Sequence, residues 1–346
     1  MPKIVRFYEL GGPAKLKLED APTQEPKEGE VKLRVQATGL NRAELLYMAG
    51  RYFEQPKLPS RIGYEAAGVV EAVGAGVDKS LVGKKVATVP GYSMNQFGVL
   101  GEEAVVPAIV LGEYPAKLTS AEGAAIWMQY LTAWGALVHY GKVGQGDFAL
   151  LPAASSSVGL AAIQIVKDAG GKSIAATRTS KKKKELLELG ADFVIATEEE
   201  DLPARVNEIT GGKGARVIFD PVAGPFVEKL AEAAAPGGII FEYGGLSMQP
   251  TPFPTRAAMS KGISLRGYSL MEFRARPEIV EGAKKYVYDR LADGRFKLKI
   301  AKTFPLAHAR EAYEYLASNA QVGKVVITVS STTTGEGLSN RAHSQT

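Results

Sequence analysis

Residues 147–180 hold the pattern that most limits how this chain can fold. A short apolar run at 148–151 is followed by small residues, a helical pattern from Val158 to Asp168, two glycines and a second apolar run at 173–176. Strand, tight turn, helix and strand within about 30 residues make a βαβ unit. The turn before its helix carries free backbone N–H groups, and the helix dipole there favours an anion such as a pyrophosphate.

The glycine fingerprint of dinucleotide-binding units is largely missing from this turn. The three GxGxxG positions hold Ala154, Ser156 and Gly159, so only the glycine needed for close helix–strand packing remains. Alone, the turn also fits an α/β core that binds no nucleotide. If a pyrophosphate binds here, serine hydroxyls add donors to it. The candidate contacts are then Ala154, Ser155, Ser156, Ser157, Val158 and Gly159.

The patterns on either side of this unit predict two domains, as the chain length also does. Residues 1–120 alternate apolar and polar positions between turn residues, which indicates half-buried antiparallel strands, as in a small barrel. Residues 121–140 predict one long helix, capped by Ser120 and ended by Gly141, as a candidate hinge. Between 147 and 268, apolar strands alternate with crossover helices, which predicts a six-stranded, doubly wound parallel sheet of the α/β class.

The end of the chain mixes helix and strand patterns up to residue 329, and we expect this part to rejoin the first domain. The polar residues after 330 lack periodicity and predict a mobile tail. The expected domains are 1–120 with 271–330, then 121–270, with a tail at 331–346.

Composition excludes several classes of function. The chain has no cysteine, so disulfides, thiolate nucleophiles and thiolate metal sites are ruled out. Its net charge of +5 is spread along the chain without a basic stripe interleaved with aromatic residues, which argues against nucleic acid as a partner. No apolar stretch reaches membrane-spanning length and the start lacks a leader pattern, so we expect no membrane contact and a cytoplasmic protein.

Arg178 lies where an NAD-binding unit would carry an acid. Counting 19 residues on from Gly159 gives Arg178, which lies between Thr177 and Thr179 with no acid beside it in the sequence. Arginine and hydroxyl groups suit a 2′-phosphate, through charge-assisted hydrogen bonds. The sequence therefore predicts NADP(H) as the cofactor.

Four consecutive lysines, Lys181–Lys184, follow this segment. Cations in a first helical turn oppose the helix dipole, and a bound anion would offset that cost. We take Lys182 as a candidate phosphate contact, with a solvated helix face as the equal alternative. For Lys183 and Lys184 the solvated face is the favoured interpretation.

A series of stretches in order is more specific than any single motif. This series resembles the medium-chain dehydrogenase/reductase superfamily, in its zinc-free quinone oxidoreductase (zeta-crystallin-like) branch, over residues 1–329. The resemblance implies a GroES-like β-rich catalytic domain split around a Rossmann domain, and a homodimer formed through the sheet edge near 264–268. The stretches are GLNRAELLYMAGRY (39–52), GYEAAGVVEAVGAGV (63–77), YLTAWGAL (130–137), AASSSVGLAAIQ (153–164), LGADFVI (189–195) and GKVVI (323–327).

The resemblance also implies that no metal is bound. Zinc-dependent members carry a Cys and a His where this chain has Asn41 and Tyr64. Glu65 remains, and we expect it to form hydrogen bonds within the barrel. Simple alcohol oxidation relies on a metal to stabilise an alkoxide, and this stabilisation is not expected here.

Without a metal, the accessible chemistry is hydride delivery to the β-carbon of a conjugated carbonyl, with donors stabilising the resulting enolate. The resemblance places Asn41 at the nicotinamide ribose and substrate carbonyl, and Tyr52 as proton donor, since a tyrosine is protonated at pH 7. Structural alternatives stay open. Asn41 can cap a helix at 42–48, Tyr52 can be barrel packing, and Tyr64 can fill the former zinc cavity or serve as a second acid.

Further cofactor contacts are implied by position alone. Thr132 resembles a threonine near the nicotinamide, and Lys324 a basic residue near the pyrophosphate. Gly244 and Leu246 follow one parallel strand, while Tyr268 and Leu270 follow the last, where the carboxamide would meet backbone groups.

The leading hypothesis is an NADPH-dependent reductase of a small quinone, enone or enal. An enoyl-thioester reductase is a second possibility, with Arg256, Lys261 and Arg274 as candidate contacts to a carrier phosphate. A third is an NADPH-binding protein with little turnover. Substrate identity depends on the shape of loops such as 53–60, 92–100 and 249–259, which residue types alone do not define.

Overall fold

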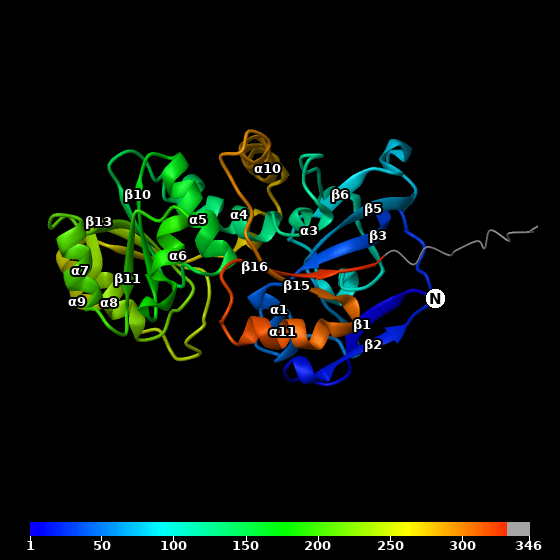
Figure 1. The fold of residues 1–346 in the computed structure, drawn as a ribbon, viewed down its shortest axis with the longest axis horizontal. Coiled ribbons are helices and arrows are strands. Elements are labelled where there is room, and N and C mark those ends of the chain that lie inside the picture. The colour runs from blue at the N-terminus through cyan, green and yellow to red at the C-terminus, as the bar shows by residue number, and fades with distance from the viewer. Residues whose placement is uncertain (331–346) are drawn as a thin grey trace, which may run out of the picture.

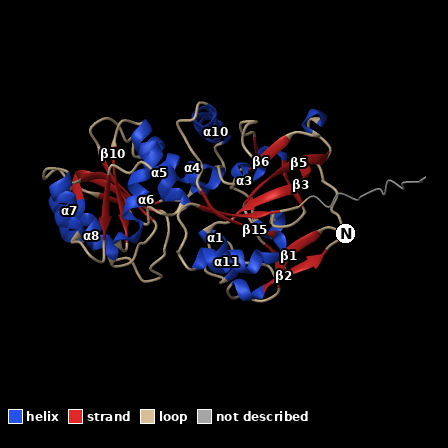
Figure 2. Cartoon of the chain, viewed as in Figure 1, coloured by secondary structure: helices blue, strands red, loops and turns tan. Residues whose placement is uncertain are grey.

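The computed structural model describes residues 1–330, so the tail predicted at 331–346 lies outside the described residues. The molecule is elongated and has two lobes (Figure 1). Helices alternate with strands in one lobe, and strands dominate the lobe that contains the N-terminus (Figure 2). Within residues 1–330, no helix combines the length and apolar character needed to cross a bilayer.

The first lobe is built on a six-stranded sheet whose neighbouring strands are all parallel. The strand order β11-β10-β9-β12-β13-β14 places β9 beside both β10 and β12, which is the switch point of a doubly wound sheet, where ligands bind at the carboxyl ends of the strands. The predicted sheet is confirmed. Its strands are β9 (Phe148–Leu151), β10 (Lys172–Thr177), β11 (Phe193–Ala196), β12 (Ala215–Asp220), β13 (Ala234–Glu242) and β14 (Ser264–Gly267).

Helices cover both faces of this sheet because its strands are apolar on both sides. Leu160 and Ile163 of one helix join the core on one face, and Val206 and Leu230 of two others pack on the opposite face. Residues 255–259, expected within the loop at 249–259, belong to a helix instead. The helices are α5 (Ser157–Asp168), α6 (Lys183–Glu188), α7 (Leu202–Ile209), α8 (Phe226–Ala233) and α9 (Thr255–Lys261).

The second lobe contains a seven-stranded sheet and a three-stranded sheet. Burial alternates along 30–36 of its longest strand, as period-two patterning predicts. The last strand pairs antiparallel with this one, Val326 opposite Gly39, so the end of the chain returns to the first domain's sheet. The strands are β1 (Lys3–Phe7), β2 (Leu16–Asp20), β3 (Glu30–Gly39), β4 (Ser60–Arg61), β5 (Glu65–Val73), β6 (Lys85–Thr88), β7 (Glu103–Pro107), β8 (Leu111–Gly112), β15 (Ile300–Pro305) and β16 (Lys324–Thr328).

Further helices complete this lobe and the connection between the lobes. Two of them, near residues 42 and 94, flank the site described below. They are α1 (Arg42–Met48), α2 (Met94–Phe97), α10 (Pro277–Ala292) and α11 (Ala309–Ala317), with 3-10 turns η1 (Pro13–Lys15), η2 (Lys79–Leu81), η3 (Ala108–Val110), η5 (Ser180–Lys182), η6 (Leu270–Phe273) and η7 (Leu306–His308).

The single helix predicted at 121–140 is wrong. The segment is divided into α3 (Ser120–Gly123), α4 (Trp127–Trp134) and the π-helix η4 (Gly135–Tyr140), and the cap is Thr119 rather than Ser120. The Thr119 hydroxyl accepts from Glu122 N at 3.2 Å. The backbone of Ala124 lies so close to Gly39 that a Cβ there would be 1.9 Å from its carbonyl oxygen. Packing against β3 therefore interrupts a segment that is helical by local pattern.

Candidate active site

The turn after β9 is shaped by its own serine and glycine. Ser156 caps α5, and its hydroxyl oxygen accepts from Gly159 N at 3.0 Å. Ala153 adopts a φ of 50°, a left-handed conformation usually left to glycine. A Cβ on Gly159 would lie 2.5 Å from the Ala154 carbonyl oxygen, so the glycine is required for close packing of helix on turn, as its place in the motif predicts.

We expect Gly159→Ala to lower the free energy of unfolding by about 1–3 kcal/mol, because the added methyl overlaps backbone atoms that cannot move aside. Gly282→Ala in α10 is the matched control, since nothing lies within 4 Å of its Cβ position. In an exposed helical site this change should stabilise by about 0.5–1 kcal/mol. Urea denaturation measures both. Equal effects would contradict the packing argument.

Lys182 reaches this turn from the segment after β10. Its ammonium donates to Ser155 Oγ at 3.1 Å and to the carbonyl oxygens of Asn319 at 2.9 Å and Gln321 at 2.8 Å. Burial and nearby Arg178 lower the pKa of Lys182. Thus the candidate phosphate residue Lys182 lies against the candidate pyrophosphate turn.

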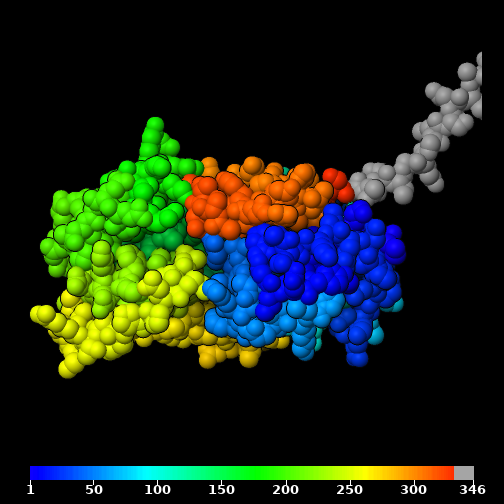
Figure 3. Space-filling view, turned by 90° about the horizontal axis from the view of Figure 1, so that it is seen from below, coloured from blue at the N-terminus to red at the C-terminus, as the bar shows by residue number. Residues whose placement is uncertain are grey.

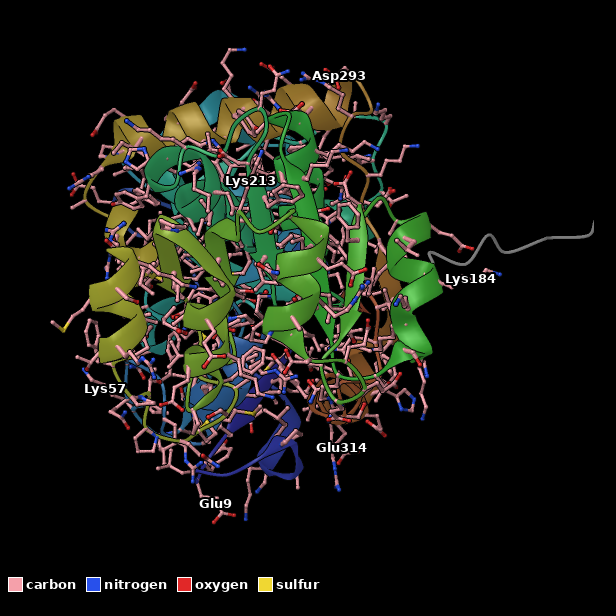
Figure 4. The ribbon with its side chains drawn as sticks, turned by 90° about the vertical axis from the view of Figure 1, so that its left-hand side faces the viewer. Glu9, Lys57, Lys184, Lys213, Asp293 and Glu314 are labelled. Carbon is pink, nitrogen blue, oxygen red and sulfur yellow. The ribbon has the colours of Figure 1, made fainter. Side chains whose placement is uncertain are left out.

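The other lysines of the run point elsewhere. The Lys184 side chain is 91% exposed, at the outer edge of α6 (Figure 4), and Lys183 lies 3.5 Å from Glu200. These positions agree with the solvated helix face predicted for both. Arg178 is exposed, while Thr177 and Thr179 are half-buried at the end of β10.

A segment from the end of the chain closes the turn from the other lobe. Gly323 N donates to the Ser155 carbonyl at 3.0 Å, and Gly323 forms an isolated parallel bridge with Ser156. In Figure 3 this orange-to-red segment lies between the green residues of the parallel sheet and the blue N-terminal residues. The candidate cofactor turn is thus built at the junction of the two lobes.

The structure contradicts the expected position of Lys324 near the pyrophosphate. The residue is 1% exposed, and its ammonium donates to Asn41 Oδ1 and to Glu65 Oε2, both at 2.7 Å. Its side chain runs along Gly39, where a Cβ would lie 2.7 Å from Lys324 Cε. Gly323 reaches the turn, but the next residue begins β16 and directs its side chain into the β-rich lobe.

Asn41 is held on both sides of its amide. An ammonium only donates, so the Asn41 oxygen faces Lys324 and its NH₂ group donates to Gly39 O at 3.2 Å and Glu44 Oε1 at 3.3 Å. With its NH₂ engaged, Asn41 has an acceptor lone pair to offer a ribose hydroxyl, but no donor for a substrate carbonyl. Asn41 is also the N-cap residue of α1, as the structural alternative predicts, and the Glu44 carboxylate accepts from Asn41 N at 3.1 Å in a capping box.

Sequence reasoning missed Glu44, which is fully buried beneath the site. Glu44 accepts from Tyr313 Oη at 2.7 Å and from Tyr64 N at 3.1 Å. Burial raises the pKa of Glu44, and these hydrogen bonds partly offset that rise. The spacing of Asn41 and Glu44 matches a capping box, which was the available signal.

Three tyrosine rings pack edge to face beside this network. The ring of Tyr64 lies 6.2 Å from that of Tyr52 and 5.7 Å from that of Tyr92. Tyr64 is 2% exposed, whereas Tyr52 is half-buried. Burial raises the pKa of Tyr52 and of Tyr64 above the ordinary value for a phenol. Both hydroxyls therefore keep their proton at neutral pH and can donate it.

Glu65 connects the network to the helix between the lobes. Its second carboxylate oxygen accepts from Met128 N in α4 at 3.1 Å, in agreement with the hydrogen bonding expected for it. One turn later the Thr132 hydroxyl donates to Met128 O at 2.5 Å, so its proton is used within α4. Thr132 is buried and adjoins the network through α4.

The remaining candidate cofactor residues follow β13 and β14, which are adjacent strands. Gly244 and exposed Leu246 continue from β13, and Leu246 N donates to the Pro221 carbonyl at 3.0 Å. Tyr268 and Leu270 follow β14 with their side chains buried. The sheet thus brings these two segments to one edge.

Two carboxyl groups at the same edge were also missed. Asp220 and Glu242 are partners in register at the ends of β12 and β13. Asp220 accepts from Val222 N at 2.9 Å and Ala223 N at 2.8 Å. Burial and the charge of Asp220 raise the pKa of Glu242, so Glu242 holds a proton at neutral pH.

The side chains at the position where the resemblance implies zinc in other members do not fit a metal. Lys324 already supplies a positive charge between Asn41 and Glu65, and the ligands that bind zinc best, thiolate and imidazole, are absent from those positions. Within residues 1–330, no three His, Asp or Glu side chains gather as a metal site.

Comparison with known proteins agrees with this geometry. Residues 27–124 match the alcohol dehydrogenase GroES-like domain family, and residues 157–285 match the zinc-binding dehydrogenase family. Quinone oxidoreductase 1 of Escherichia coli is 30% identical over 331 residues, covering 93% of this chain and 98% of that protein. Human quinone oxidoreductase is 30% identical over 330 residues, covering 94% and 97%.

Solved structures show the same fold. The E. coli quinone oxidoreductase complexed with NADPH aligns with a TM-score of 0.86 at 28% identity, covering 94% of this chain and 99% of that one. The quinone oxidoreductase of Pseudomonas syringae also gives 0.86 at 28% identity, covering 95% and 100%. The chain belongs to the medium-chain dehydrogenase/reductase superfamily, in its quinone oxidoreductase branch.

Proposed function

We propose that this protein is an NADPH-dependent oxidoreductase that transfers a hydride to a quinone or an α,β-unsaturated carbonyl compound without a metal. The observation that carries the proposal is the replacement of the metal position by the Lys324–Asn41–Glu65 network beside protonated tyrosines. The relatives named quinone oxidoreductase, and the Burkholderia relative named 2-haloacrylate reductase, 29% identical over 334 residues, support it.

The residues at the lobe junction fit NADP(H). The N-terminus of α5 would hold a pyrophosphate, and Ser155 and Ser156 add hydroxyl groups there. Arg178 would bind a 2′-phosphate, and Lys182, whose three protons bond Ser155, Asn319 and Gln321, would add its positive charge. The Asn41 oxygen would accept from the nicotinamide ribose. The two relatives whose structures contain NADPH support this choice of cofactor.

When bound, NADPH supplies a hydride from its nicotinamide ring. Reduction of an enone then needs one proton at the α-carbon, and reduction of a quinone needs one on oxygen. We propose that Tyr52 Oη holds and delivers this proton. Tyr64, almost fully buried behind it, fills the former metal cavity and supports the Tyr52 ring.

A panel of small quinones, enals and enoyl thioesters tests the function, with NADPH oxidation followed at its near-ultraviolet absorbance. We expect turnover of at least one free quinone or enone with NADPH, and slower turnover with NADH. Tight NADPH binding with no turnover of any compound would instead favour the third hypothesis, an NADPH-binding protein with little turnover.

Dialysis against a strong chelator tests the metal-free chemistry. We expect the rate on the best substrate to stay unchanged, because Asn41, Tyr64 and Lys324 offer no zinc site. Restoration of a lost rate by added zinc would contradict this expectation.

One contact weakens the enoyl-thioester alternative. Lys261, a candidate for a carrier phosphate, donates to the carbonyl oxygens of Ala231 at 3.2 Å and Ala234 at 3.0 Å, where it satisfies the end of α8. Arg256 and Arg274 remain exposed. The candidate site for a carrier phosphate is therefore left with two cations instead of three.

Three further points belong to this proposal. We propose that residues 1–120 and 271–330 form one domain, that residues 121–270 form the other, and that the protein is cytoplasmic. We also propose a homodimer through β14, the edge strand whose only sheet neighbour among the described strands is β13. Light scattering on a size-exclusion column measures the dimer, and a monomer mass would exclude it.

A further inference from the structure

The segment after β10 gathers donors where a dinucleotide's adenosine ribose lies. In a βαβ unit this ribose is held near the end of the second strand. Arg178 is exposed there, and Ser180 presents its backbone N–H and its hydroxyl at the start of η5. Lys182, two residues further on, contacts Ser155 of the pyrophosphate turn.

A carboxylate from the neighbouring strand occupies two of these donors. Glu199 Oε1 accepts from Ser180 N at 2.9 Å and from Ser180 Oγ at 3.2 Å. The loops after β10 and β11 run side by side, because Glu198 N donates to the Arg178 carbonyl at 2.9 Å. An acid absent from the local sequence around Arg178 is therefore present beside it in space.

Among the described residues Glu199 forms no direct ion pair, unlike Glu200, although the charge of Lys183 acts on it from a greater distance. Glu200 lies 3.5 Å from Lys183 and 3.0 Å from Arg205. Within the described part of the chain, Glu199 has no cationic partner within 4 Å. The hydrogen bonds from Ser180 hold the pKa of Glu199 below its usual value, so it stays ionised at neutral pH.

We propose that Glu199 is a specificity-determining residue that weakens binding of the 2′-phosphate. Its carboxylate competes with the phosphate for the Ser180 donors and repels it, so NADPH is preferred over NADH less strongly than Arg178 and Lys182 alone would allow. This inference rests on the proposed use of NADP(H).

Glu199→Gln tests this role, with Glu198→Gln as the matched control. Both remove one exposed charge from the same loop, but only Glu199 bonds Ser180. At low salt we expect Glu199→Gln to tighten NADPH binding about fivefold, from loss of a like charge a few ångströms away. We expect NADH binding to change by less than about twofold in both variants, since surface charges have small effects. Quenching of tryptophan fluorescence measures the dissociation constants.

Adenosine 2′,5′-bisphosphate serves as a second probe that lacks the nicotinamide, and thermal melting verifies that both variants fold like the wild type. In Glu199→Gln the affinity for the bisphosphate should rise together with that for NADPH. This gain in affinity should shrink at high salt, because screening weakens the repulsion. Equal NADPH affinities in the two variants, or weaker binding in Glu199→Gln, would overturn this inference alone. A wild type that binds neither NADPH nor the bisphosphate would overturn the proposed function together with it.

Discussion

Lys324→Met is expected to lower the free energy of unfolding by about 3–5 kcal/mol, because it leaves a buried carboxylate without its counter-charge. Glu65 is fully buried and would keep only the Met128 N–H as a partner, while the Asn41 oxygen would lose its donor. Urea denaturation followed by tryptophan fluorescence suits the measurement, since Trp127 lies next to Met128 in α4.

Two further variants separate the buried charge from the lost side chain. Lys299→Met breaks a surface pair with Glu185, 3.2 Å apart and about two-fifths exposed on each side, and should cost at most about 1 kcal/mol. The double variant Lys324→Met with Glu65→Gln should recover much of the loss, because no charge stays buried. Equal losses in Lys324→Met and Lys299→Met would contradict the role of the buried pair.

Tyr52→Phe is expected to reduce kcat by about 10²- to 10⁴-fold, the usual contribution of a positioned general acid. NADPH affinity should not change, because the removed hydroxyl serves the substrate. Since burial raises the pKa of Tyr52 above its ordinary value, kcat should stay level from pH 6 to about 9 and fall only when the phenol loses its proton at higher pH. Steady-state kinetics with the best substrate measures these effects.

Tyr64→Phe is the matched control, because its ring packs against that of Tyr52. If Tyr64 fills the former metal cavity, this variant should change kcat by less than about tenfold, since ring packing is retained. The reverse order of effects would assign the proton to Tyr64. An unchanged kcat in Tyr52→Phe would remove Tyr52 as the acid.

Local sequence pattern predicted most elements of the cofactor-binding lobe. The apolar run at 148–151 coincides with β9, the helical pattern at 158–168 with α5, and the apolar run at 173–176 lies within β10. Apolar periodicity encodes these elements directly, because each strand or helix must bury its own apolar positions. The helical pattern at 121–140 did not predict that this segment is divided, because close contact of Ala124 with Gly39 breaks the helix.

The candidate site residues also divide into those with a local sequence signal and those whose partners are distant in the sequence. Motifs and spacing found Gly159, Ser156 and Lys182, which lie within one βαβ unit and its next turn. They missed Glu44 and Glu199, whose partners are distributed over several elements. They also placed the Lys324 side chain near the pyrophosphate turn, whereas its ammonium bonds Asn41 and Glu65.

The order of elements, the absence of thiol chemistry and the choice of Arg178 over an acid were all readable from the residues themselves. The direction of the Lys324 ammonium was not, because its partner Asn41 lies 283 positions away and the two meet only when β16 pairs with β3. The approach of Glu199 to Ser180 likewise depends on the pairing of β11 with β10. Periodicity reports which face of an element is buried, whereas packing between elements determines which charged groups meet there.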